Sequence, residues 1–216
     1  MNVTVYGSNG RVGNEVVRIC RERRHVVECA DIAVKPSEDF CPDIVIDFSL
    51  PQATYEVVAY CAKHHCPLVS GVTGQTAEQQ AEIDNLSRRV KVVQRSNFSA
   101  GIALVTELCK MIAHAKPTWD CDIVETHRRG KIDCPSGTAK KIAAELATAK
   151  GSFGKVTIHS LRSGTNFGTH EIVFGGNGES VTITHRAENV QVFASGAVDV
   201  AEQIVAKNSK IYPPEN

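Results

Sequence analysis

VTVYGSNGRVGNEVV, residues 3–17, joins a short β-branched run to the start of a helix through a glycine-rich turn. Gly7, Gly10 and Gly13 have the spacing GxxGxxG, and Asn9 stands where the common dinucleotide fingerprint GxGxxG has its second glycine. Glycine lets the backbone turn tightly and approach a pyrophosphate, whose charge is stabilised by the amides and dipole of a helix N-terminus. The strand-turn-helix context favours a dinucleotide site, although similar turns occur in βα units that bind no nucleotide.

The first hundred residues continue as β-branched runs that alternate with helical stretches, which is typical of parallel strands joined by crossover helices. Strands are expected at 3–6, 26–31, 43–48, 67–72 and 91–96. Helices are expected at 12–22, 52–64 and 76–89. These elements predict a Rossmann-type α/β fold, a doubly wound parallel sheet whose ligands bind at the carboxyl ends of its strands.

The character of the chain changes after residue 97. The elements expected there are a helix at 101–115, a strand at 122–127, a helix at 136–150, strands at 156–161, 170–174 and 180–186, and a closing helix at 193–207. Three successive strands fit an antiparallel or mixed sheet better than further βαβ units. The second region is therefore predicted to be an α+β substrate domain, followed by a loosely held polar tail.

The overall composition limits the function classes. The 216 residues include 24 basic and 24 acidic side chains, so the net charge is zero, and no long run of like charge predicts a nucleic-acid or membrane partner. Neither a signal peptide nor an apolar run of the ~20 residues needed for a membrane helix is recognisable. The eight cysteines form no CxxC pair, so reduced, mostly buried thiols are expected. These features predict a soluble, cytoplasmic protein.

An acidic residue follows the second expected strand. Asp31 lies 18 residues beyond Gly13, where a carboxylate can accept hydrogen bonds from the adenosine ribose hydroxyls. It would repel the 2'-phosphate of NADP, and Ile32 supplies no adjacent arginine. NADH is therefore the predicted cofactor, while Arg11 and Lys35 leave use of NADPH open.

The most specific stretch is ETHRRGKIDCPSGTAKKIAAEL, residues 125–146, which predicts a strand end, a basic loop and a capped helix. Ser136 is the expected N-cap. The amides of Gly137 and Thr138 lie in the first helical turn, where the helix itself supplies no partner. Together with the Thr138 hydroxyl they would bind an anion.

Positive charge gathers in the same loop, against Glu125 and Asp133 alone. Its basic residues are His127, Arg128, Arg129 and Lys131. A charge pair at ~4 Å is worth roughly 4 kcal/mol at an effective dielectric of about 20, before desolvation is subtracted. The loop therefore predicts a pocket for one or two carboxylates.

Three other interpretations of this loop compete with anion binding. A solvated basic loop before an ordinary capped helix would need no ligand. A Ser136 nucleophile with His127 as base lacks the GxSxG elbow. Metal binding by Glu125, His127 and Cys134 lacks a recognised ligand spacing, so no metal is expected. Hydride transfer from a nicotinamide, with His127 and Lys131 donating and accepting protons, needs neither a serine nucleophile nor a metal. The residues favour an NAD(P)H-dependent reductase that acts on a small acidic substrate.

Six motifs are spread over nearly the whole chain. They are GSNGRVG at 7–13, Gly71-Val72-Thr73, Arg95-Ser96-Asn97-Phe98, E-x-H-x-x-x-K-x-D-x-P-S-G-T at 125–138, HSLRSGTNFGTH at 159–170 and FASGA at 193–197. Together they resemble the 4-hydroxy-tetrahydrodipicolinate reductase family, also called dihydrodipicolinate reductase.

The resemblance implies NAD(P)H-dependent reduction of dehydrated 4-hydroxy-tetrahydrodipicolinate to tetrahydrodipicolinate, in the diaminopimelate and lysine pathway. It implies that His127 is the acid/base residue and Lys131 the proton donor. The implied substrate ligands are Arg128, Ser136, Gly137 and Thr138. The implied cofactor-binding residues are Gly7, Ser8, Asn9, Gly10, Arg11, Val12, Gly13, Asp31, Gly71, Val72, Thr73, Arg95, Ser96, Asn97 and Phe98.

The resemblance also implies a domain organisation. Residues 1–98 with 189–216 would form the dinucleotide-binding domain, and residues 99–188 would form a substrate-binding and oligomerisation domain. Hinges near 97–101 and 189–192 would let the domains close over the substrate and exclude water. The implied assembly is a homotetramer built through the sheets of the substrate domain.

Two positions depart from the family pattern. Arg128 stands where a second histidine is common, and Val190 stands where an arginine is common. Two alternatives therefore stay open. One is an amino-acid dehydrogenase of the aspartate or homoserine type, which would not explain the PSGT loop, and the other is a nucleotide-sensing module without catalysis.

Overall fold

The computed structural model describes residues 1–31, 33–148 and 156–206. The chain forms two compact units. Unit 1 consists of Met1–Phe98 with Val190–Asn216, and unit 2 consists of Ser99–Asn189. The expected helix ends at 149–150 and 207, and the polar tail, lie outside the described residues.

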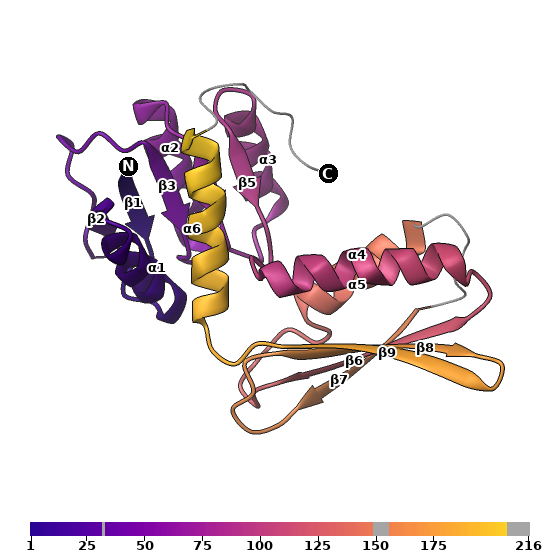
Figure 1. The fold of residues 1–216 in the computed structure, drawn as a ribbon. Helices are drawn as coiled ribbons and strands as arrows, with labels where there is room; N and C mark the ends of the chain where they lie inside the picture. Colours follow the sequence, from indigo (N-terminus) through magenta and orange to yellow (C-terminus); the bar gives the residue numbers. More distant parts are fainter. Residues whose placement is uncertain (32, 149–155, 207–216) are drawn as a thin grey trace. The chain divides into compact units, whose positions relative to one another are not determined.

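Unit 1 is built on a five-stranded parallel sheet with the strand order β2-β1-β3-β4-β5 (Figure 1). Its strands are β1 (Asn2–Tyr6), β2 (Val26–Ala30), β3 (Ile44–Asp47), β4 (Leu68–Ser70) and β5 (Val92–Gln94). Its helices are α1 (Arg11–Glu22), the 3-10 turn η1 (Pro51–Ala53), α2 (Thr54–His64), α3 (Ala77–Ser87) and α6 (Gln191–Ala206). The order reverses between β1 and β3, which is the position where parallel sheets of this kind bind ligands.

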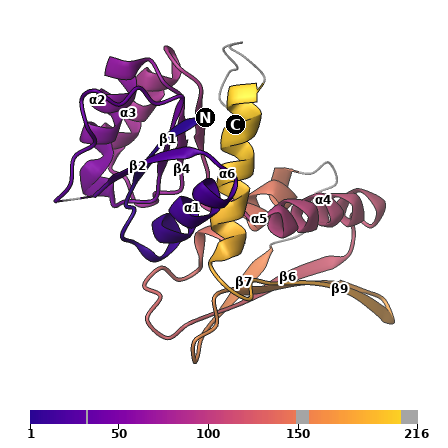
Figure 2. The same ribbon diagram turned by 60° about the vertical axis from the view of Figure 1, so that its left-hand side comes forward.

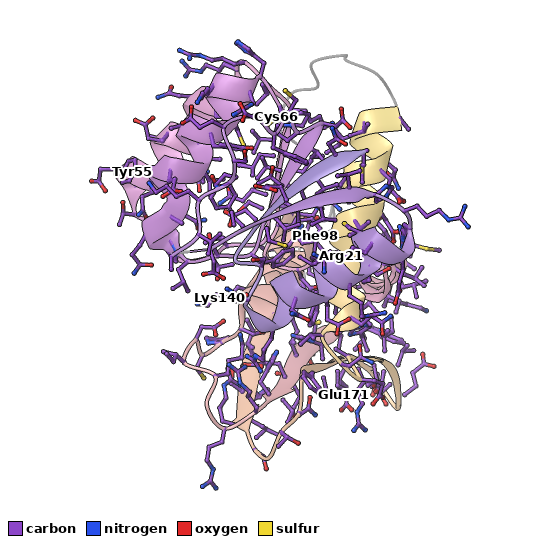
Figure 3. The ribbon with its side chains drawn as sticks, turned by 90° about the vertical axis from the view of Figure 1, so that its left-hand side faces the viewer. Arg21, Tyr55, Cys66, Phe98, Lys140 and Glu171 are labelled. Atoms are coloured by element: carbon purple, nitrogen blue, oxygen red, sulfur yellow. The ribbon has the colours of Figure 1, made fainter. Side chains whose placement is uncertain are left out.

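Helices cover both faces of this sheet. Val16 of α1 and Ala197 of α6 pack with the inward side chains of β1 and β3 on one face. Val57 of α2 and Leu86 of α3 pack on the other face (Figure 2). Side chains that point away from the sheet are exposed to solvent. Tyr55, for example, points outward from α2 and is 53% exposed (Figure 3). The predicted doubly wound sheet is confirmed.

Several elements are shorter than the sequence predicts. The strand expected at 67–72 is observed as β4, Leu68–Ser70, and only these three residues pair with β5. The helix expected at 76–89 begins after Thr76, whose hydroxyl accepts from Gln79 N while the Gln79 side chain accepts from Thr76 N. This reciprocal capping box fixes the first turn of α3.

Unit 2 has a four-stranded mixed sheet with the order β7-β6-β8-β9. Its elements are α4 (Ala100–Ala115), β6 (Asp120–His127), α5 (Gly137–Thr148), β7 (Thr157–Arg162), β8 (Thr169–Gly176) and β9 (Glu179–Arg186). β6 runs parallel to β7 and antiparallel to β8. A mixed sheet was predicted, but the segment β6-α5-β7 is itself one further βαβ unit, which the sequence interpretation disfavoured.

One face of this second sheet carries both helices of the unit (Figure 1). Ile123, Phe174 and Ile142 are fully buried between the sheet and the helices. The strict alternation of burial along β6 places Glu125 and His127 on this covered face. Within the described part of the chain, no helix is both long and apolar enough to cross a bilayer.

Candidate active site

The predicted cofactor residues of unit 1 gather at the carboxyl edge of its sheet. Gly7 follows β1, Asp31 follows β2, Gly71 follows β4 and Arg95 follows β5. Asn9 N donates to Asp31 Oδ2 at 3.0 Å, which ties the second strand end to the glycine turn. Parallel strands present all their carboxyl ends at one edge, so four segments far apart in sequence form one surface.

The glycine turn has almost no room for side chains. Gly7 has a φ of +74°, and a Cβ on Gly13 would lie 2.0 Å from the Gly7 carbonyl oxygen. Gly10 is the N-cap of α1, where no side chain makes a capping hydrogen bond. At its glycine positions the turn packs backbone against backbone at a helix N-terminus, which suits the close approach of a pyrophosphate.

The end of β3 also contributes to this edge, although the sequence predicted no site residue there. A Cβ on Gly7 would lie 2.6 Å from the Phe48 carbonyl carbon, and a Cβ on Gly71 would lie 2.2 Å from the Phe48 ring. That ring meets the Phe98 ring edge to face at 5.9 Å. The buried Asp47 carboxylate accepts from Ser49 N at 2.9 Å and so holds the turn after β3. The strand expected at 43–48 ends at this edge, so the sequence did contain a signal that residues near 48 contribute to the site.

In unit 2, a buried carboxylate organises the predicted catalytic loop. Glu125 is fully buried, and its Oε1 accepts from Arg162 Nη2 at 2.8 Å and from Ser136 N at 3.2 Å. Its Oε2 pairs with His127 Nδ1. Burial would raise the pKa of Glu125, but the hydrogen bonds from Arg162 and its other partners hold that pKa at about 2. Glu125 is therefore ionised, so Nδ1 of His127 carries the proton and Nε2 is left for exchange.

The two neighbouring histidines are kept neutral. Burial lowers the pKa of His127, an effect that Glu125 opposes and that Lys131 and Arg162 reinforce. His170 lies edge to face with His127 at 5.2 Å. Burial, followed by the repulsion that a protonated His127 would exert, lowers the pKa of His170 to about 4. Ser136 Oγ lies 3.2 Å from His170 Nε2. A neutral imidazole at position 127 can take or return a proton near neutral pH.

The low pKa of His170 predicts a loss of stability in acid. Its folded pKa of about 4 lies below the ordinary 6.5, so between these values the unfolded chain binds more protons. This stabilisation is complete above pH 6.5, and about 3 kcal/mol is lost as the pH falls to about 4. Urea unfolding at pH 7 and pH 4.5 should show that the free energy of unfolding falls less for His170→Asn than for the wild type. The variant His114→Asn, at an exposed histidine, should behave as the wild type. Equal losses of unfolding free energy in all three proteins would contradict the low pKa of His170.

The loop between β6 and α5 places Lys131 and Gly137 on the two oxygens of one carboxylate, that of Asp133. Lys131 Nζ lies 2.7 Å from Asp133 Oδ1, and Gly137 N donates to Asp133 Oδ2 at 3.3 Å. Ser136 Oγ accepts from Ala139 N at 3.2 Å, so the predicted N-cap is confirmed. Ammonium and helix N-terminus thus lie beside the Glu125 and His127 pair.

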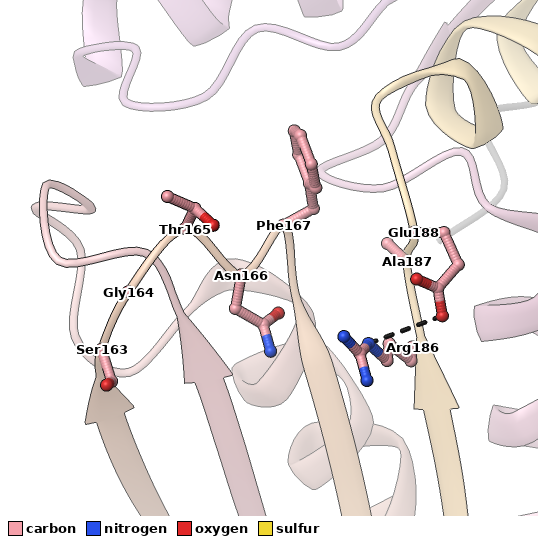
Figure 4. Close-up of a pocket in the computed structure, with 8 residues that line it drawn as sticks. All are labelled: Ser163, Gly164, Thr165, Asn166, Phe167, Arg186, Ala187 and Glu188. Carbon is pink, nitrogen blue, oxygen red and sulfur yellow. Dashed lines mark ion pairs between the residues drawn. The ribbon is translucent and has the colours of Figure 1, made fainter.

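A pocket of about 370 Å³ lies beside the end of β6 (Figure 4). It is lined by Ser163, Gly164, Thr165, Asn166, Phe167, Arg186, Ala187 and Glu188. The β7–β8 loop is tied to the end of β6, because Ser163 N donates to His127 O at 2.9 Å and Arg128 N donates to Asn166 O at 2.8 Å. The motif 159–170 pointed to this region, but its roles could not be assigned from sequence.

The sequence predicted no metal site, and the possible metal ligands that the structure gathers differ from the set Glu125, His127 and Cys134. Ligand atoms of Glu125, His127 and His170 lie within 4.8 Å of one another, whereas Cys134 is exposed and outside this group. The guanidinium of Arg162 already binds Glu125, and its positive charge opposes a divalent cation there. The trio is better explained as a proton-handling group.

Comparison with known proteins assigns both halves of the chain. Residues 31–98 match the family model described as dihydrodipicolinate reductase, N-terminus, and residues 101–216 match the one for its C-terminus. The chain belongs to the dihydrodipicolinate reductase family. This confirms the predicted family and makes the protein an oxidoreductase, since the relatives of this family carry that activity in their names.

Family relatives match over nearly their full length. The 4-hydroxy-tetrahydrodipicolinate reductase of Xanthomonas axonopodis pv. citri is 37% identical, with 98% of this chain and 95% of the relative covered. That of Natronomonas pharaonis is 36% identical, with 100% and 99% covered. The dipicolinate-bound dihydrodipicolinate reductase of Paenisporosarcina sp. TG-14 has the same fold, with a TM-score of 0.77, 24% identity and 95% of each chain covered. The dinucleotide-binding N-terminal half supports use of NAD(P)H.

Proposed function

We propose that this family member reduces dehydrated 4-hydroxy-tetrahydrodipicolinate to tetrahydrodipicolinate with NAD(P)H, in diaminopimelate and lysine biosynthesis. The observation that carries the proposal is the ionised Glu125 paired with a neutral His127, beside Lys131 and the N-terminus of α5. A planar dicarboxylate needs cations and amide donors around it, and the reduced product needs a proton. This loop supplies both.

The cofactor would bind at the carboxyl edge of the unit 1 sheet. The backbone cradle at Gly7–Gly13 fits a pyrophosphate, since Cβ atoms there would collide with the chain itself. Asp31 would hold the adenosine ribose, and residues 71–73 and 95–98 would line the nicotinamide side. Bound NAD(P)H supplies the hydride. Unit 1, residues 1–98 with 190–216, would then bind the dinucleotide, and unit 2, residues 99–189, would bind the substrate. The boundary expected between residues 188 and 189 differs from this division by one residue.

The residues of unit 2 would then divide the proton work and the substrate binding. His127 would act as the acid/base residue, with Glu125 orienting its ring, and Lys131 would donate the proton. The substrate carboxylates would be held by Arg128, Ser136, Gly137 and Thr138. Thr138 is 8% exposed and Ser136 is 2% exposed, so both lie in a sheltered position where a hydrogen bond to an anion is strong.

The function is tested by following NADH absorbance while a synthase condenses aspartate semialdehyde with pyruvate to supply the substrate. Prompt oxidation of NADH supports the proposal. Oxidation with aspartate-type substrates alone would favour an amino-acid dehydrogenase, and binding of NADH without any oxidation would favour a nucleotide sensor.

We expect NADH to be preferred to NADPH. The Asp31 carboxylate faces the glycine turn through Asn9 N and would repel a 2'-phosphate. The ratio of kcat/KM should favour NADH by about tenfold, and Asp31→Asn should reduce that ratio toward one. Asp39→Asn, in the exposed segment after β2, is the control. Equal efficiencies with both cofactors in the wild type would overturn the preference.

A homotetramer in the cytoplasm completes the proposal. Both helices of unit 2 pack on one face of its sheet, and Leu161, on the opposite side of β7, is 52% exposed. This face offers a surface for joining copies of the chain, and light scattering should report four chain masses. All eight cysteines are unpaired, which agrees with a reducing compartment.

A further inference from the structure

Asp133 already occupies two donors that the proposed function assigns to the substrate. Its Oδ1 lies 2.7 Å from Lys131 Nζ, and its Oδ2 accepts from Gly137 N at 3.3 Å. One carboxylate therefore bridges the proposed proton donor and the N-terminus of α5. This is the contact that a substrate carboxylate would make.

The main chain of Asp133 is fixed independently of its side chain. Arg162 Nη2 donates to the Asp133 carbonyl oxygen at 2.6 Å and, at 2.8 Å, to the buried Glu125. The Asp133 side chain is 49% exposed, and that of Lys131 is 22% exposed. The carboxylate can thus rotate into solvent while the loop stays anchored by Arg162.

Asp133 is also charged under the conditions of catalysis. Burial would raise its pKa, but the hydrogen bond and charge of Lys131 outweigh burial and lower it. An ionised group that binds the same donors as the substrate competes with it directly.

We propose that the Asp133 carboxylate is a built-in stand-in for a substrate carboxylate, and that the dicarboxylate displaces it from Lys131 and Gly137 on binding. This inference rests on the proposed function. A ligand with one carboxylate exchanges one ion pair for another and gains little. A dicarboxylate gains further contacts with the remaining donors, so the stand-in favours dianions over simple carboxylates. When no substrate is bound, Asp133 remains the partner of the Lys131 ammonium and the Gly137 amide.

The test measures binding of pyridine-2,6-dicarboxylate to the NADH-saturated full-length protein by calorimetry. Asp133→Asn keeps the size and an acceptor oxygen but removes the charge that competes. Its dissociation constant should fall about three- to fivefold, the strength of a partly exposed ion pair. The KM for the substrate should fall by a similar factor.

The matched control is Glu107→Gln, which removes an exposed carboxylate that lies 3.0 Å from Lys110 Nζ on α4. Its dissociation constant should equal that of the wild type. Unchanged or weaker binding by Asp133→Asn would overturn the displacement and leave Asp133 as a structural brace. Should that variant not fold, Asp133→Ser gives the same comparison. A wild type that neither binds the dicarboxylate nor oxidises NADH would instead refute the proposed function.

Discussion

His127→Ala should lower kcat by about 10² to 10⁴, the usual contribution of a positioned acid/base group. The imidazole is the group whose Nδ1 is held by Glu125, leaving Nε2 to exchange a proton. Its loss leaves Glu125 with Arg162 and Ser136 N as partners, so the fold should survive. Steady-state kinetics at saturating NADH measure the effect, and Lys131→Ala should have a loss of similar size.

The controls separate chemistry from binding. The KM for NADH should stay near the wild-type value in His127→Ala, because the predicted cofactor residues lie in unit 1. His114→Ala, an exposed histidine on α4, should retain full activity. Near-normal turnover in His127→Ala or Lys131→Ala would remove these residues from the mechanism.

Glu125→Gln should lower the free energy of unfolding by about 3 kcal/mol at pH 7, because it leaves a largely buried guanidinium without its counter-charge. Glu125 is fully buried and Arg162 is 16% exposed. The folded pKa of Glu125, about 2, lies below its ordinary 4.5, so this stabilisation is present above pH 4.5 and lost as the pH falls toward 2. Turnover should fall as well, since His127 loses its orienting carboxylate.

A double-mutant cycle measured by urea unfolding tests this pair. The double variant Glu125→Gln with Arg162→Met should be less destabilised than the sum of the single variants, because no charge is then left unpaired. Glu107→Gln, which loses an exposed pair, should change stability by less than about 0.5 kcal/mol. Additive effects of Glu125 and Arg162 would show that the pair is not coupled.

Some parts of the candidate site could be predicted from local sequence. The glycine spacing around Gly7 and Gly13 predicts a turn in which two backbone segments pass close together. The structure shows that Cβ atoms have no room there. The alternation along β6 predicts that Glu125 and His127 share a face. The Ser136 cap follows from residue type at a helix start.

Other parts depend on pairings between distant segments. Arg162 and His170 were not assigned roles, and Asp47 with Phe48 was missed at the edge of the first sheet. The ladder places Arg162 opposite His127 from the parallel side and His170 opposite Glu125 from the antiparallel side. Nothing in residues 159–170 alone states which strand they will join.

The sequence by itself determined the alternation of strands and helices, the glycine turn and the order of acid, base and cap from residue 125 to residue 138. These features are local, since they follow from periodicities of two and 3.6 residues and from steric limits on single residues. The tertiary structure alone decided which cation neutralises Glu125 and which ring faces His127. Strand register fixes both, and register is chosen by burial across the whole sheet, where a slip of one residue would turn every side chain to the other face.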